Sequence, residues 1–454
     1  MSPVRTSSLA WWSPLSFILV GSLFLGGCGG GGGAAAVTLT PTAPGVPTAL
    51  VAVAGAGEVG LTWSEPEGDG GSAITGYVLY RRGTPGILAE LGRTAGAVTS
   101  YVDEGLAAGT TWVYAVAAVN EVGEGGRSDE ASATALLFIV ETVTVPAGTF
   151  TMGATDTEGG YAIEFPRHEV TLSSYDVGKF EVTNGEYAAV LNWALAKGHL
   201  KGDAAGTSYV GGNVYADGQL LLEVTSSFCQ IAFADGAFTV KSAPSSSVPV
   251  PMADHPVVMV SWYGAVAFCT WLSESAGLRP WYGVSSEPWE LRPPLAPNGY
   301  RLPTEAEWEQ AAAWDGAGVP VPKHFVFGVS SDTIDATRCN VAEANPLGLL
   351  TYPYTVPVGS YDGRAGTLDS PSPVGCYDMC ASVWEWCQDW YSLYTVDPQE
   401  NPVGPPSGSY RLLRGGSWFN DEPRCRAAYR ASDQPALRSY CVGFRVLVSP
   451  SGAE

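Results

Sequence analysis

The sequence RGGSWFNDEPRCR, residues Arg414–Arg426, carries the most specific pattern in this chain of 454 residues. Its paired glycines suit a close backbone approach or a backbone angle that other residues avoid. A hydroxyl, an amide and a thiol follow these glycines at Ser417, Asn420 and Cys425. The stretch therefore predicts a tightly shaped loop, and the motifs around it indicate the fold to which that loop belongs.

Other motifs accompany this loop in the rest of the chain. Val145–Gly153 reads VPAGTFTMG, which is typical of a strand, and Phe180–Tyr187 reads FEVTNGEY, which predicts the start of a helix. Arg301–Glu309 reads RLPTEAEWE. There Thr304 and Glu307 have the spacing of a capping box, in which each side chain accepts a hydrogen bond from the other residue's backbone N–H. The carboxylates of this run are therefore interpreted as structural and not as an acid–base pair.

These motifs, together with DMCASVWEW at Asp378–Trp386 and VGFRV at Val442–Val446, resemble the formylglycine-generating enzymes, also called sulfatase-modifying factors. The resemblance extends over most of Val143–Val448, so residues 138–449 are assigned to one domain of that kind. It implies an α+β fold of the C-type-lectin-like class, with few regular elements and much loop. A hairpin-bearing insertion is predicted within residues 198–252.

The resemblance also implies a reaction, in which a copper-dependent oxidase uses oxygen to convert a cysteine of an unfolded sulfatase segment into formylglycine. Family members carry two cysteines in the loop, five residues apart, whereas this chain has Cys425 at the second position and Asn420 at the first. Two soft thiolates suit copper(I), and the hard amide oxygen of Asn420 does not replace one of them. Copper is therefore expected only if the oxidase alternative holds.

Four further site residues follow from the resemblance. Ser417 corresponds to the family's active-site serine and Trp384 to an aromatic wall, with a turn position and plain packing as the alternatives. Calcium is implied through oxygen ligands. Glu385 matches one such ligand, although Ser382 stands three residues earlier where the family usually has an asparagine. Asn340 is assigned to a second calcium loop.

The chain has nine cysteines. With Cys28 set aside as a lipid-modified residue, the remaining cysteines are even in number, which favours disulfides in an oxidising compartment. Zinc binding is the alternative, but the spacing of Cys376, Cys380 and Cys387 lacks the paired knuckles of a zinc site. Disulfides are therefore predicted, and Cys425 is a candidate half-cystine as well as a candidate catalytic thiol.

The first residues predict the compartment. Arg5 and the apolar run Leu15–Leu25 have the pattern of a signal peptide, and the run is too short for a membrane span. It leads into LGGC, which resembles a bacterial lipobox, so Cys28 is the predicted lipidation site, with an ordinary secretory signal as the alternative. Residues 1–27 are then the leader and residues 28–43 a Gly/Ala/Pro tether. We expect a lipid-anchored protein of the bacterial cell envelope, on its periplasmic side or at the cell surface.

Residues 44–136 show short alternating strands with turns between them, as in a small antiparallel β-sandwich. LTW at Leu61–Trp63, GSAITGY at Gly71–Tyr77 and AVNEVGEG at Ala118–Gly125 resemble a fibronectin type III domain. A spacer or a binding module is the expected role. The formal net charge of −22 argues against nucleic acid as a partner, because phosphate binding needs clustered Lys and Arg.

Two functions are open at this point. The first is binding or envelope assembly, with a peptide, protein or glycan as the ligand, and its basis is the thiolate missing at residue 420. The alternative is an oxidase of the sulfatase-modifying-factor family that forms formylglycine or modifies another protein substrate, and its basis is the retained Ser417 and Cys425. An envelope scaffold is a structural variant of the first. Contact with the membrane is expected through the lipid anchor.

Overall fold

The computed structural model describes residues 40–154, 159–202, 209, 212–283, 297–316, 323–342 and 344–448. The predicted leader, the predicted lipidation site Cys28 and most of the predicted tether lie outside this part of the chain. Within it, none of the helices has both the length and the apolar character that a bilayer crossing requires.

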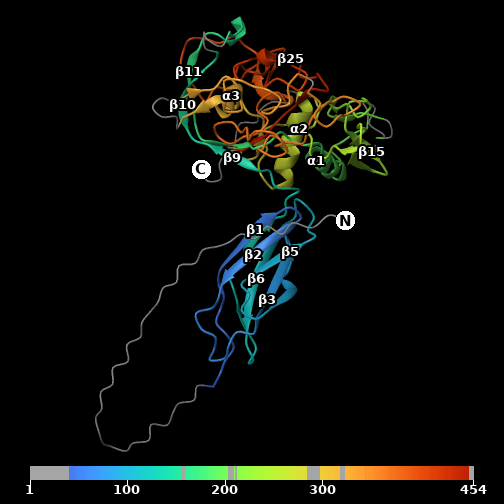
Figure 1. The fold of residues 1–454 in the computed structure, drawn as a ribbon. Coiled ribbons are helices and arrows are strands. Elements are labelled where there is room, and N and C mark those ends of the chain that lie inside the picture. Colours follow the sequence, from blue (N-terminus) through green and yellow to red (C-terminus); the bar gives the residue numbers. More distant parts are fainter. Residues whose placement is uncertain are drawn as a thin grey trace, which may run out of the picture. The chain divides into compact units, whose positions relative to one another are not determined.

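The N-terminal part of the described chain folds as an antiparallel β-sandwich, shown in blue to cyan in Figure 1. One sheet contains β1 (Thr48–Gly55), β2 (Glu58–Ser64) and β5 (Ser100–Glu104), and the other contains β3 (Gly76–Gly83), β4 (Ala89–Ala95), β6 (Thr111–Val119), β7 (Glu124–Arg127) and β8 (Ala131–Thr134). Alternate residues of β2, namely Val59, Leu61 and Trp63, enter the core, where the Trp63 ring meets the edge of Tyr77 at 5.2 Å. The period-two pattern therefore predicted the right architecture, and the fibronectin type III fold is confirmed.

The helices of the C-terminal part begin at side-chain caps. The capped helices are α1 (Asn184–Ala196), α2 (Trp262–Ser275) and α3 (Glu305–Ala313). Two short 3-10 segments, η1 (Ala162–Glu164) and η2 (Glu422–Cys425), accompany them. Thr183, Ser261 and Thr304 each accept a hydrogen bond from a backbone N–H in the first turn of the helix that follows. Glu307 in turn accepts from the Thr304 N–H at 2.8 Å. The predicted capping box is therefore present, and it satisfies N–H groups that the helix cannot bond by itself.

Short strands in small sheets make up most of the remaining regular structure, which confirms the α+β prediction. The sheet that leads into the loop Arg414–Arg426 has the order β25 (Ala431–Asp433), β24 (Arg411–Arg414), β22 (Trp384–Trp390), β26 (Val442–Gly443). Two other sheets have the orders β19 (Tyr300–Arg301), β27 (Leu447–Val448), β12 (Tyr175–Gly178), β9 (Thr142–Val145) and β10 (Gly148–Met152), β11 (His168–Leu172), β23 (Gln399–Glu400). The two-stranded pairs are β13 (Val214–Ala216) with β14 (Gln219–Leu222), β15 (Ile231–Ala234) with β16 (Ala237–Val240), β17 (Ser242–Ala243) with β18 (Val250–Pro251), and β20 (Trp314–Asp315) with β21 (Lys323–His324). The first three pairs are the hairpins expected within residues 198–252.

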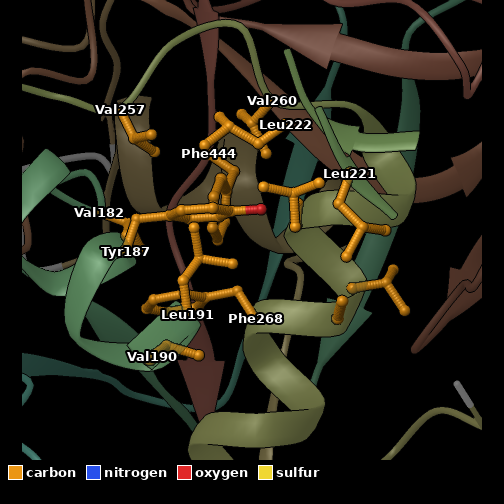
Figure 2. Close-up of a cluster of buried hydrophobic side chains, with 14 of the residues drawn as sticks. Val182, Tyr187, Val190, Leu191, Leu221, Leu222, Val257, Val260, Phe268 and Phe444 are labelled. Carbon is orange, nitrogen blue, oxygen red and sulfur yellow. The ribbon is translucent and has the colours of Figure 1, made fainter. Parts of the chain in front are cut away.

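One core joins α1 and α2 to the C-terminal segments (Figure 2). The Tyr187 ring of α1 stacks on Phe268 of α2 with centroids 5.6 Å apart, and Phe444 meets both rings edge-on. Val257 and Val260, from the segment before α2, are fully buried in the same core. Burying each such side chain contributes about 1.5–3 kcal/mol, so packing more than regular secondary structure positions the loops of this domain.

All eight described cysteines are free thiols in the structure, and only Cys441 is not fully buried. Cys229 and Cys269 lie in the core of α1 and α2, whereas Cys376 and Cys387 lie in a second core around α3. Buried cysteines of this kind behave as small apolar side chains. For these four residues the even number of cysteines therefore did not indicate disulfide bonds.

Candidate functional site

The loop that follows β24, residues 415–425, is shaped by its paired glycines, and we call it the site loop. Gly415 and Gly416 have φ angles of +94° and +72°, which residues with a side chain rarely adopt. A Cβ on Gly416 would lie 2.7 Å from the sulfur of Cys425. The glycines therefore serve both predicted purposes, the unusual backbone angle and the close approach.

Ser417 and Asn420 are held by each other. The Ser417 hydroxyl donates to Oδ1 of Asn420 at 2.7 Å, and the Asn420 N–H donates to the Ser417 carbonyl at 2.8 Å. The Asn420 carbonyl accepts from the backbone N–H of Ala342 at 3.0 Å. Ser417 is fully buried. The serine that the resemblance marks as a site residue is thus bonded to the very residue that replaces the first cysteine.

Cys425, at the far end of the site loop, is fully buried. Its sulfur lies 3.5 Å from the Asp421 carbonyl. Burial raises the pKa of the Cys425 thiol far above its ordinary value, and the neighbouring Cys339 raises it further. Because the thiolate is both the nucleophile and the metal ligand, a thiol that stays protonated at neutral pH has little reactivity.

A second cysteine adjoins the site loop, and no sequence signal pointed to it. Among the described cysteines Cys441 alone is partly exposed. Its sulfur lies 3.3 Å from Oγ of Ser439, and the side chain of Ser417 is a further neighbour. Burial raises the pKa of this thiol as well. The fold therefore brings the Ser417 hydroxyl of the site loop next to the thiol of Cys441 in the C-terminal segment.

Trp384 lies in a row of aromatic rings that ends at a groove. Its ring, which is 8% exposed, lies 5.8 Å from the ring of Tyr429, and Tyr429 meets Tyr161 edge-on at 5.4 Å. Tyr161 lines a groove of about 540 Å³ beside η2, and Phe327 is another of its lining residues. Trp384 therefore does not line the groove itself, and it reaches the lining residue Tyr161 only through Tyr429.

Buried ion pairs surround the site loop, and we call them the frame. They are Arg414 with Glu305 and Glu309, Arg426 with Glu164, Arg430 with Glu305, and Arg445 with Glu385. Burial alone would raise the pKa of Glu309, but the charge of Arg414 and a hydrogen bond from His324 outweigh it and hold that pKa at about 2. Each charged side chain of the frame thus has a partner of opposite sign from another segment. Sequence reasoning missed these pairs, although four arginines inside otherwise apolar motifs of an acidic chain were an available signal.

The two residues assigned to separate calcium loops, Glu385 and Asn340, have different surroundings. Both oxygens of Glu385 accept from Arg445 at 2.7 Å, and one of them also accepts from Nε1 of Trp308 at 2.8 Å. Asn340 donates to the Tyr354 carbonyl at 2.7 Å, and its buried Oδ1 has no protein partner. Calcium needs about six to eight oxygens, and the described residues contain no cluster of three Asp, Glu, His or Cys side chains suited to a metal. Glu385 therefore does not fit calcium, and Asn340 contributes one suitable oxygen without a surrounding site.

The structure thus gathers Ser417, Asn420 and Cys425 in one loop. Their arrangement does not fit copper(I), because the amide of Asn420 is bonded to Ser417 and Cys425 is the single thiol that the site loop offers. Cys28 lies outside the described residues. The site that remains is a rigid loop beside a groove with aromatic and acidic lining.

Comparisons with known proteins identify what these segments are similar to. Residues 129–450 match the family model of the sulfatase-modifying factor enzyme 1-like domain, and residues 45–134 match that of the fibronectin type III domain. The formylglycine-generating enzyme of Streptomyces coelicolor is 32% identical over 330 residues, which cover 69% of this chain and 92% of that protein. The serine/threonine-protein kinase pkn1 of Chlamydia pneumoniae is 28% identical over 311 residues, which cover 68% of this chain. The match spans only 38% of the length of that kinase.

Solved structures are similar as well. PvdO from Pseudomonas aeruginosa is 24% identical and covers 68% of this chain and 94% of its own, with a TM-score of 0.44.

Proposed function

Because the chain belongs to the sulfatase-modifying factor enzyme 1-like family, we propose that it uses the scaffold of that family to bind a ligand and not to oxidise one. The proposed ligand is a peptide, a protein or a glycan. The protein is exported to the bacterial envelope and anchored by lipid at Cys28. Its fibronectin type III domain acts as a spacer or as a second binding module.

The hydrogen bond between Ser417 and Asn420 carries this proposal. It commits the Ser417 hydroxyl to a neutral amide at 2.7 Å, at the position where the oxidases of the family have a thiol. An amide oxygen is a hard ligand and does not bind copper(I) well. Cys425 is buried and protonated, so it does not compensate. The site loop is thus a stable turn and lacks a two-thiolate centre.

The groove beside η2 supports ligand binding. Tyr161 is 50% exposed and offers an apolar ring with a polar tip, as ligand-binding tyrosines do. The guanidinium of Arg426 is neutralised by Glu164 at 2.6 and 2.7 Å, so it adds no free positive charge. Of the two acidic residues at the rim, Asp332 is paired with Lys323 at 2.7 Å, so Glu422 gives the rim its acidic character. The groove therefore favours a basic peptide segment or a glycan that stacks on Tyr161, and it disfavours nucleic acid.

A copper(I) titration against a competing chelator tests the proposal. We expect the wild-type protein to compete poorly, and Asn420→Cys to bind one copper(I) per chain because it places a second thiol in the site loop. Cys425→Ala in the Asn420→Cys background is the control and should abolish that binding. Tight one-to-one binding by wild type that requires Cys425 would overturn the proposal.

The neighbourhood of Cys441 favours one alternative, an oxidase that modifies a protein thiol by a variant route. The partly exposed thiol of Cys441 lies outside the site loop and is a neighbour of the Ser417 side chain. Incubation with a sulfatase peptide and copper, followed by mass spectrometry, separates the two functions. The binding proposal expects an unchanged peptide, and conversion that is lost in Cys441→Ala would establish the alternative.

A further inference from the structure

Three cysteines meet in a small apolar cluster next to the site loop. Cys339, Cys380 and Cys425 are buried there together with Phe327 and Val329. The proposed function assigns no role to the first two thiols. Phe327 also lines the groove, so the cluster adjoins the surface on which a ligand is proposed to bind.

The geometry distinguishes one pair within this cluster. The sulfur atoms of Cys339 and Cys380 are 4.0 Å apart. Cys425 is arranged differently, since its carbonyl oxygen and not its sulfur faces Cys380, at 3.4 Å. The sulfur of Cys425 approaches the Asp421 carbonyl at 3.5 Å and lies against Gly416. The cluster therefore offers two adjacent thiols and a third that has its own contacts.

We propose that Cys339 and Cys380 form a disulfide when the protein folds in an oxidising compartment, and that Cys425 remains a thiol. The two thiols lose two protons and two electrons as the sulfur–sulfur bond forms. The electrons reduce the disulfide of a dithiol oxidase, or of oxidised glutathione, to two thiols that take up the protons. This inference rests on export and not on ligand binding, so the two can fail separately.

The bond would join two segments that both hold the site loop. The Ala342 N–H, three residues after the first cysteine of the pair, donates to the Asn420 carbonyl at 3.0 Å. The Ala381 N–H, directly after the second, donates to the Gly415 carbonyl at 3.0 Å. A crosslink between these segments fixes the two supports relative to each other. It also stabilises the fold, because it restricts the unfolded chain.

Peptide mapping of the whole protein tests the pair. The chain is unfolded, refolded in oxidised and reduced glutathione, alkylated in denaturant, and mapped without reduction. Chymotryptic cleavage after Tyr377 and Trp384 separates Cys380 from its neighbouring cysteines. We expect one dominant crosslink, between Cys339 and Cys380, and an intact mass lower by two hydrogen atoms. A dominant crosslink to Cys425, or folded protein with every cysteine alkylated, would overturn the proposal.

Single variants provide the matched controls. Cys339→Ser should lose the crosslink, whereas Cys425→Ser should keep it. Reduction should lower the melting temperature of the wild type and of Cys425→Ser but leave that of Cys339→Ser unchanged. Circular dichroism shows whether each variant folds, and the wild-type map decides the question even if one does not. Equal sensitivity of all three proteins to reduction would contradict the assignment.

Discussion

The frame and the site loop adjoin in the sequence, yet they are stabilised in opposite ways. Arg414 ends β24 as a fully buried cation with two glutamates as partners, and the site loop begins at the next residue. In the site loop the side-chain contact is a neutral one, between Ser417 and Asn420. Its one ion pair, Arg424 with Asp421, has both side chains more than half exposed.

This difference separates the fold of the family from its reaction. The frame depends on charged partners from distant segments, so a change at one position leaves a buried charge without a partner. Asn420 could replace a cysteine without such a cost, because the loop satisfies its amide locally. A chain can therefore keep the scaffold of the family while a residue of the site loop changes. The following predictions test this contrast, in order of decreasing effect.

The largest effect is expected for Arg414→Ala in the frame. The substitution leaves Glu309 buried without its main partner, which costs about 3–5 kcal/mol of unfolding free energy. Arg424→Ala in the site loop is the matched control, because its exposed pair is worth about 0–1 kcal/mol. Urea unfolding followed by tryptophan fluorescence measures both. Similar losses for the two variants would remove the distinction between frame and loop.

A pH effect is expected at Asp389, a buried carboxylate that accepts from the Glu305 N–H at 2.9 Å. Burial, and then the charge of Glu305, raises the pKa of Asp389 to about 7. Since the unfolded carboxyl titrates near 4, the folded protein binds the extra proton between about pH 4 and 7, and Asp389 lowers the unfolding free energy as the pH rises through that range. Asp389→Asn removes this dependence. The stability of the variant relative to wild type should therefore increase by about 2–3 kcal/mol between pH 5 and pH 8.

Unfolding at several pH values, for wild type, Asp389→Asn and the exposed control Asp397→Asn, measures this slope. The control should follow the wild type at every pH. A constant difference between Asp389→Asn and wild type would show that Asp389 is ionised throughout.

The shape of the site loop is tested by Gly416→Ala. Alanine at this position meets a positive φ angle and places its Cβ 2.7 Å from the Cys425 sulfur and 2.8 Å from the Arg424 carbonyl. Gly366→Ala is the control, because its φ of +86° is similar but no atom lies within 4 Å of the added Cβ. We expect Gly416→Ala to lose about 1–2 kcal/mol more than the control, from steric contact alone. Equal losses would mean that the loop relaxes freely.

The smallest effect is expected for Ser417→Ala. It removes the neutral hydrogen bond to Asn420, which is worth about 1 kcal/mol, and a longer one from the Phe419 N–H at 3.4 Å. A double-mutant cycle with Asn420→Ala should give a coupling energy of about 1 kcal/mol between the two side chains. Zero coupling would show that the bond does not hold the site loop.

What the sequence could predict was decided by distance along the chain. Thr304 and Glu307 are three residues apart, so the capping box followed from spacing alone, and the paired glycines signalled their own backbone angles. Arg426 and Glu164 are 262 residues apart, and no local sequence pattern identifies Glu164 as the partner of Arg426. Because the fold brings these partners together only in three dimensions, the frame was missed while the fold class was predicted correctly.

The sequence named candidate site residues, and the structure adds the contacts between them. The replacement of a thiol by Asn420 was visible in the sequence, whereas its bond to Ser417 needed the turn geometry. Glu385 was assigned to calcium by position, but Arg445 and Trp308 occupy its oxygens. The neighbourhood of Cys441 depends on the packing of the C-terminal segment, which no spacing rule describes.

The Glu307 carboxylate that closes the capping box also binds Arg301 of β19, at 2.6 and 2.7 Å. The first turn of α3 therefore cannot open without breaking the ion pair between Glu307 and Arg301 of strand β19. Helix ends commonly fray, and their amides then exchange with solvent faster than the rest of the helix. Here the amides of that first turn should exchange at the rate of the sheet that contains β19, which makes them reporters of the cooperative unit and not of local fraying.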